Sequence, residues 1–446
     1  MSQEWLFASA SELGRGIAKG EIDPVHLTDI YLDAIDGHEH RDRIFSVVTH
    51  DRARTEAKAA AARAVAGQRL GLLDGVPISW KDLFDSAGTA TEAGTAYLKG
   101  RVPKHDAVVL DNATKAGLVC LGKTHMSELA FSGIGFNPIT QTPPNVNDPD
   151  VVPGGSSSGA ATSVAFGLAA AGIGSDTGGS VRIPSAWNDI VGFKPTFGTL
   201  SLSGVVPLCE TFDTVGPLCR SVEDAAHLMA AMSGQKAADL TNADIKGRRF
   251  LILDTVAMDD VRAEPKKGFD AAVEQIKAAG GIVTHGSVPE VAEAMPLSAC
   301  LFTVDAYAQW KDVIEKNPSL MFGEILERFR SGATHSGLDY VQGWMKLRKL
   351  RLGFAEKTAG FDAVIMPTSP ILPPNIERLA VDHNYYVSEN LMALRNTRIG
   401  NLMGLAAMSL PTGVPSCGIM LLGAAGQEGR LLRLGAGVEA ALMRDG

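Results

Sequence analysis

The sequence has few cysteines, no recognisable export signal and no long apolar run. Five cysteines are scattered over 446 residues, without a Cys-x-x-Cys pair or a histidine at metal-ligand spacing. Such a set predicts reduced thiols in a cytoplasmic protein, not a disulfide framework. The first residues lack a basic region followed by an apolar core, so no secretion signal is expected. The longest weakly polar run, residues 160–174, is too short to cross a bilayer and predicts a buried helix.

The sequence also lacks an excess of positive charge. Fifty acidic residues outnumber 41 basic ones, which gives a formal net charge of −9. A negative balance disfavours a surface that binds nucleic acid or an anionic membrane, so neither is expected as a partner. Hydrophobic residues make up 45% and charged residues 20%, proportions typical of a globular protein with a large core.

Helical and strand-like patterns alternate along the chain. Apolar residues recur at three- and four-residue steps over 27–35, and the alanine-rich segment 57–66 is a second expected helix. Further on, short apolar strands and amphipathic helices follow one another, which predicts an α/β fold. The expected elements are helices over 106–116 and 267–279 and strands over 118–121, 249–253 and 282–284. Residues 70–78 are expected to contain a further strand, Gly-Val-Pro-Ile, that presents Lys81.

Two glycine-rich serine clusters stand close together in the sequence. Residues 153–159 read Pro-Gly-Gly-Ser-Ser-Ser-Gly, and residues 174–182 read Gly-Ser-Asp-Thr-Gly-Gly-Ser-Val-Arg. Glycine lets backbone N–H groups converge on an anion, so the second cluster is a candidate oxyanion nest around Ser180. A serine beside such a nest is a candidate nucleophile if a base activates it. The best candidate for the base is Lys81, in the segment 75–82.

Six segments together carry a resemblance to a known family. They are residues 75–82, 122–128, 153–197, 212–225, 361–368 and 410–423. In these segments the chain resembles the amidase signature family, whose members hydrolyse amides with a Ser-Ser-Lys triad. The resemblance covers roughly residues 10–440 and is weakest over 290–360. It implies an α/β/α sandwich around a central mixed β-sheet flanked by helices.

The resemblance assigns roles to three side chains. Ser180 would be the nucleophile that forms an acyl-enzyme, and Ser156, which the family places in a cis peptide linkage, would relay protons to Lys81. Ser157 and Ser158 are chemically identical to Ser156, and only the family motif selects among the three. A free lysine is charged at neutral pH, so Lys81 needs burial to act as a base.

The same resemblance assigns supporting residues. Backbone N–H groups of Thr177, Gly178, Gly179 and Ser180 would form the oxyanion hole. We interpret Asp176 and Arg182 as a structural ion pair. Candidate substrate-binding residues are Met126, Phe131, Gly155 and Trp187. The apolar loop 131–136 favours a small aryl or alkyl amide as substrate.

We expect one domain over residues 1–446. It would comprise N-terminal helices over 1–70, a core with the catalytic triad over 71–220, and a mostly helical, variable region over 290–360 that covers the substrate. A homodimer is retained as an option for its assembly.

Two phosphate-binding motifs match the sequence without the context that each requires. Residues 117–124 fit the P-loop expression, but a helix is expected before the first glycine and the intervening residues are strand-like. Residues 172–178 approximate a dinucleotide loop with the wrong spacing. No histidine and carboxylate pattern indicates a metal centre. We therefore expect no cofactor and no metal.

Two functions remain open. The first is hydrolysis of the amide C–N bond of a small molecule to a carboxylate and ammonia or an amine. The second is the glutaminase (A) subunit of a tRNA-dependent glutamyl/aspartyl-tRNA amidotransferase. The chain length and the regions 126–138 and 295–360 favour the first. A catalytically dead binding protein is disfavoured because Lys81, Ser156 and Ser180 are all present.

Overall fold

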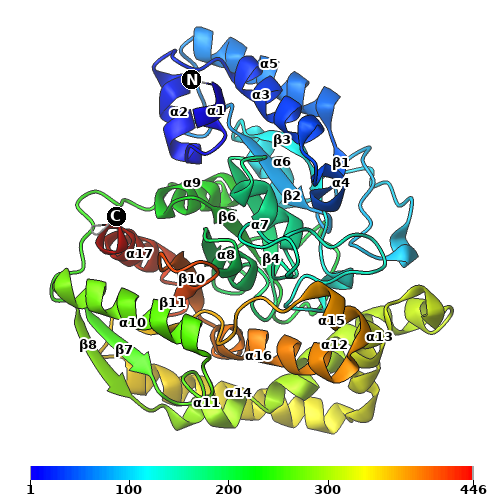
Figure 1. The fold of residues 1–446 in the computed structure, drawn as a ribbon, viewed down its shortest axis with the longest axis vertical. Helices are drawn as coiled ribbons and strands as arrows, with labels where there is room; N and C mark the ends of the chain where they lie inside the picture. Colours follow the sequence, from blue (N-terminus) through cyan, green and yellow to red (C-terminus); the bar gives the residue numbers. More distant parts are fainter. Residues whose placement is uncertain (1, 444–446) are drawn as a thin grey trace.

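An eleven-stranded mixed β-sheet runs through the molecule (Figure 1). The structure is a computed structural model that describes residues 2–443. The strand order is β1-β3-β2-β4-β6-β5-β10-β11-β9-β7-β8. The strands are β1 (Phe45–Val48), β2 (Pro77–Lys81), β3 (Val119–Thr124), β4 (Ala171–Asp176), β5 (Val191–Lys194), β6 (Thr214–Cys219), β7 (Arg249–Leu253), β8 (Ile282–Gly286), β9 (Ala363–Pro367), β10 (Ala406–Pro411) and β11 (Gly418–Gly423).

Helices flank this sheet along its whole length. Figure 1 shows the N-terminal helices (blue) at one end of the molecule and β7 and β8 at the other. The α-helices are α1 (Ser2–Trp5), α2 (Ala10–Ala18), α3 (Pro24–Gly37), α4 (Arg41–Ile44), α5 (His50–Val65), α6 (Val108–Lys115), α7 (Ser158–Ala165), α8 (Arg182–Trp187), α9 (Val222–Ser233), α10 (Ala263–Ala278), α11 (Pro289–Ala294), α12 (Leu297–Ile314), α13 (Gly323–Arg330), α14 (Gly337–Thr358), α15 (Ile376–Val381), α16 (His383–Leu402) and α17 (Glu428–Leu442). The predicted α/β fold with a mixed sheet is confirmed.

Two neighbouring strands, the third and fourth in the sheet order, determine where the glycine-rich segments lie. Strand β2 is parallel to its neighbour β4, with Ile78 opposite Ala171 and Trp80 opposite Ile173. Because the carboxyl ends of parallel neighbours lie at the same edge of a sheet, the residues that follow both strands come together there. Strand β2 ends at Lys81 and β4 ends at Asp176, just before the second serine cluster.

One expected element is wrong in part. The apolar run 160–174 does not form one buried helix: α7 ends at Ala165, and the run continues as β4 from Ala171. Gly167 has a φ of 73°, a left-handed conformation that suits glycine and ends the helix. Residues 171–176 pair with β2 and β6. Their extended conformation is therefore determined by this pairing and not by the low polarity of the run.

The segment that resembles the family least is helical. It comprises α11, α12, α13 and α14, which pack against one another between β8 and β9 in the chain. Its function as a cover for the substrate stays a prediction. Within residues 2–443, no helix is both long and apolar enough to cross a membrane.

Candidate active site

Lys81 is buried at the end of β2 and faces two serines. Its Nζ lies 2.7 Å from Ser156 Oγ and 2.8 Å from Ser175 Oγ. Burial lowers the pKa of Lys81 to about 7, although the negative charges of Asp213 and Asp176 partly oppose this shift. A substantial fraction of the amine is therefore neutral near pH 7, which is the form that accepts a proton.

The three consecutive serines have different partners. Ser156 follows a cis peptide bond from Gly155, and its Oγ is the one that meets Lys81. The Oγ of Ser157 donates to the carbonyl oxygen of Ser175 at 3.2 Å, and the Oγ of Ser158 donates to that of His125 at 3.3 Å. Geometry thus separates side chains that the sequence alone does not distinguish.

Ser180 lies in the loop between β4 and α8, close to the backbone of the first serine cluster. The N–H of Ser157 donates to the carbonyl oxygen of Ser180 at 3.2 Å. Ser180 also lines a small cavity together with Thr177 and Gly178. The loop therefore presents the candidate nucleophile and two residues of the predicted oxyanion hole to the same space.

The four predicted oxyanion donors differ in availability. The N–H of Gly179 donates to Asp176 Oδ1 at 2.8 Å, so it is already engaged. Among the described residues, the N–H groups of Thr177, Gly178 and Ser180 have no hydrogen-bond partner. Gly179 has a φ of 142°, and a Cβ there would collide with Thr397 Oγ1, so the position requires glycine.

A buried network holds this loop. The Nη2 of Arg182 donates to Asp176 Oδ1 at 2.8 Å, the ion pair expected from the sequence, and Asn401 Nδ2 donates to the same oxygen at 2.9 Å. Burial alone would raise the pKa of Asp176, but the charge and hydrogen bonds of Arg182 hold it well below its ordinary value. Thr397 Oγ1 donates to the carbonyl oxygen of Gly178 at 2.8 Å.

The motifs did not reveal two polar groups next to the predicted triad. Ser175 is the second partner of Lys81, and its place one residue before Asp176 in the signature was the only available signal. Asp213 accepts hydrogen bonds from Thr177 Oγ1 and from the N–H of Leu208. Burial raises the pKa of Asp213 to about 6.

The predicted substrate-binding residues do not all reach the cavity. Phe131 lines it. Met126 is buried in the main core, and Trp187 is buried in a second apolar cluster, where its Nε1 donates to Ile371. Gly155 packs against the loop 127–135, since a Cβ there would lie 2.6 Å from the nitrogen of Gly135. The assignment of Met126, Gly155 and Trp187 stays a prediction.

Two arginines that the sequence did not single out also line this cavity. Arg328 comes from α13 and Arg398 from α16, and both side chains are partly buried. They lie outside every motif of the resemblance, and Arg328 belongs to the segment that resembles the family least. Only the folded chain brings them next to Ser180.

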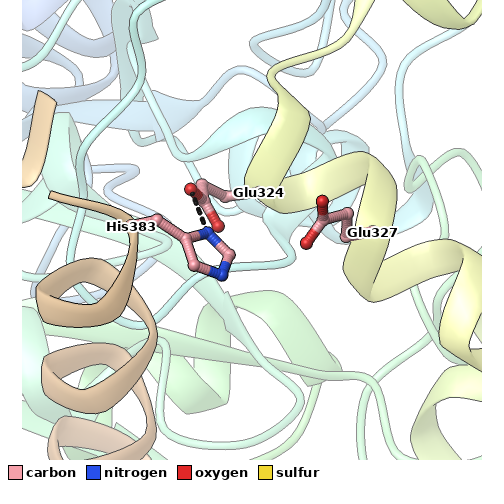
Figure 2. Close-up of side chains that lie close together, drawn as sticks. All are labelled: Glu324, Glu327 and His383. Carbon is pink, nitrogen blue, oxygen red and sulfur yellow. Dashed lines mark hydrogen bonds and ion pairs between the residues drawn. The ribbon is translucent and has the colours of Figure 1, made fainter. Parts of the chain in front are cut away.

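Three possible metal ligands lie together away from the predicted triad (Figure 2). His383, at the start of α16, bonds through Nδ1 to Glu324 Oε1 at 2.8 Å, and Glu327 lies one turn further along α13. The ligand atoms of all three lie within 4.8 Å of one another. The group is at the surface, and the ion pair between His383 and Glu324 accounts for its geometry.

Comparison with known proteins identifies the family. The family model described as Amidase matches residues 26–432. The chain is 32% identical to the A subunit of the glutamyl-tRNA(Gln) amidotransferase of Acidothermus cellulolyticus, over 97% of this chain and 94% of that protein. It is 31% identical to a 2-amino-5-chloromuconic acid deaminase of Comamonas testosteroni, over 89% and 88%. A crystal structure of an amidase superposes with a TM-score of 0.87 at 29% identity and covers 97% of this chain and 99% of that one.

The chain therefore belongs to the amidase signature family. It is an enzyme whose relatives act on the carbon–nitrogen bonds of amides.

Proposed function

We propose that the protein hydrolyses the amide bond of a small molecule through a Ser180 acyl-enzyme. The observation that carries this proposal is the buried contact between Lys81 Nζ and Ser156 Oγ, 2.7 Å long, beside the loop that presents Ser180 to a cavity. A lysine with a pKa of about 7 is a suitable general base near neutral pH.

The first half of the reaction makes the acyl-enzyme. Neutral Lys81 takes the proton of Ser156 Oγ, Ser156 takes the proton of Ser180 Oγ, and Ser180 Oγ bonds to the carbonyl carbon. The carbonyl oxygen becomes an oxyanion, which the free N–H groups of Gly178 and Ser180 stabilise. The C–N bond then breaks, and the proton on Lys81 returns through Ser156 to the leaving nitrogen.

The second half releases the acid. After ammonia or the amine has left, a water molecule gives a proton to the same relay and its oxygen attacks the acyl carbon. The bond to Ser180 Oγ breaks, and Ser180 regains its proton from the relay. The product leaves as a carboxylic acid, which loses its remaining proton to solvent and becomes a carboxylate. Ser175 supports the relay in both halves, because its hydrogen bond to Lys81 restricts the orientation of the amine.

The cavity next to Ser180 is lined mainly by apolar side chains with a few polar groups, which is typical of a site for a small organic molecule. The similarity to the deaminase of Comamonas testosteroni is compatible with this substrate class. The similarity to amidotransferase subunits supports a second candidate function, release of ammonia from glutamine within a complex that acts on tRNA.

The two candidates differ in what the purified single chain does. We expect it to release ammonia or an amine from at least one amide in a panel of glutamine, asparagine, half-amides of dicarboxylic acids, aliphatic amides and anilides. Ser180→Ala is the blank and should show no turnover. Efficient Ser180-dependent turnover of an amide other than glutamine supports the first function. Activity confined to glutamine, or absent from the single chain, contradicts it and favours the second.

A further inference from the structure

The cavity next to Ser180 contains two cationic side chains and no anionic partner for them. Arg328 and Arg398 both line it, and among residues 2–443 neither forms an ion pair with a carboxylate. Burial, together with the positive charge of Arg328, lowers the pKa of Arg398 to about 9. Burial also lowers the pKa of Arg328 to about 10. Two like charges thus line one partly buried cavity.

Several N–H groups of Arg328 and Arg398 donate no hydrogen bond within the described chain. Arg328 Nη1 donates to the carbonyl oxygen of Phe131 at 2.9 Å, and its guanidinium lies over the Phe131 ring at 4.4 Å. Arg398 Nη1 makes one long bond of 3.3 Å to Ser298 Oγ. The Nη2 of Arg398 is buried and has no partner within the described chain.

Such an arrangement is unfavourable for folding alone. A buried charge is costly unless a counter-charge or several hydrogen bonds compensate it, and a buried donor without a partner adds to the cost. The fully buried Arg182 shows the usual compensation, since it binds Asp176 and Asn401. Arg328 and Arg398 lack it, and both lie in the cavity that Ser180 lines, which indicates that a ligand supplies the missing anion.

We propose that the substrate is an amide that also carries a carboxylate, and that Arg398 and Arg328 bind this carboxylate while the amide carbonyl lies next to Ser180. The planar guanidinium fork of arginine matches the two oxygens of a carboxylate. This inference rests on the proposed hydrolase function and narrows its substrate class. It replaces the aryl or alkyl amide that the apolar loop 131–136 suggested.

Matched substrates test the charge requirement. Succinamate and butyramide have similar length, but only the first carries a carboxylate, and glutaramate and valeramide form a second pair. We expect kcat/KM to be about 100-fold higher for the charged member of at least one pair, because a site built for a polar group discriminates strongly against an analogue without it. Equal kcat/KM values within both pairs would overturn the proposal but leave the hydrolase function standing.

Substitutions of the two arginines test whether they cause the preference for an amide with a carboxylate. Arg398→Met and Arg328→Met should each reduce the charged-to-neutral ratio by about 10-fold or more, whereas Arg398→Lys should retain part of it. Arg395→Met and Arg330→Met are the matched controls on the same helices. Arg395 bonds to Ala257 and Arg330 pairs with Glu315, both away from the cavity. An unchanged ratio in both cavity variants would overturn the assignment, and the ratio itself is insensitive to a partly unfolded preparation.

Binding separates this inference from the proposed function. If the single chain hydrolyses none of the four amides, calorimetric titration of Ser180→Ala with succinamate, glutaramate and butyramide still measures the carboxylate preference. Tighter binding of a carboxylate that is lost in Ser180→Ala/Arg398→Met supports the cationic site without hydrolysis. Equal or absent binding of charged and neutral amides overturns it.

Discussion

At the scale of single residues, three chemically identical serine side chains differ in their hydrogen-bond partners and therefore in their proposed roles. Ser156, Ser157 and Ser158 are consecutive, and the motif alone favoured the first of them. In the folded chain only Ser156 Oγ meets Lys81, while the hydroxyls of the other two donate to backbone carbonyls. The proposed relay therefore depends on one of three serines, and its neighbours serve as internal controls.

Substitution of these serines tests the relay. We expect Ser156→Ala to reduce kcat/KM by about 100- to 10,000-fold, because the alanine interrupts proton transfer between Ser180 and Lys81. Ser158→Ala should reduce it by less than about 10-fold, since this hydroxyl bonds only to the carbonyl of His125. The rates are measured on the best amide of the panel, with circular dichroism as a check of folding. Comparable losses at the two positions would contradict the assignment of Ser156.

At the scale of secondary-structure elements, α16 supports the loop that carries Ser180. Thr397 donates to the carbonyl of Gly178, and Asn401 binds the ion pair of Asp176 and Arg182. The same helix contributes Arg398 to the cavity. A single helix thus connects the orientation of the loop that carries the proposed nucleophile to the proposed recognition of the substrate.

Removal of one hydroxyl from α16 tests this support. Thr397→Val has almost the same shape but cannot donate to Gly178, so we expect a loss of stability of about 1 kcal/mol. We also expect kcat to fall about 10-fold or more, because the oxyanion donors lose their fixed position. Thr358→Val, which removes a hydroxyl that bonds within α14, is the control. Thermal unfolding and steady-state kinetics provide the measurements, and unchanged kcat in Thr397→Val would refute the supporting role.

Some of the helices and strands are predictable from the sequence, and others are not. Short apolar runs such as 249–253 predicted strands correctly, and the helix-strand alternation predicted the fold class. The prediction of one helix over 160–174 is wrong because pairing with β2 and β6 is a long-range property that local polarity does not encode. Most of the P-loop match at 117–124 forms β3, which begins at Val119. Within this strand Lys123 is buried, donates to Thr91 and lies 3.2 Å from Asp82.

The candidate site was predictable only where a motif marks it. Lys81, Ser156 and Ser180 come from segments with a recognisable pattern. The fold brings the first two into contact and places the backbone of Ser180 against that of Ser157. Arg328 and Arg398 stand in segments without a motif, 70 residues apart in the sequence numbering. Their proximity depends on the packing of α13 against α16, which no local pattern reports.

At the scale of the whole molecule, burial of Lys81 at the end of an inner strand of a large sheet couples stability to pH. The pKa of Lys81 is about 7 in the folded chain, and an unfolded lysine has a pKa of about 10.4. Between these values the unfolded chain binds a proton that the folded chain does not, so stability rises with pH across this window. Below about pH 7 Lys81 is protonated in both the folded and the unfolded chain. The folded chain then carries the full energetic cost of burying this charge.

The consequence is measurable without any substrate. Relative to Lys81→Met, which carries no charge at any pH, the wild-type protein should gain about 4 kcal/mol of stability between about pH 7 and about pH 10.5. Melting temperatures of the two proteins at several pH values within this window provide the measurement. Lys266→Met, at an exposed lysine that pairs with Asp270, should run parallel to the wild type. If the difference between wild type and Lys81→Met did not change with pH, Lys81 would be charged when folded, and the proposed base would lose its physical foundation.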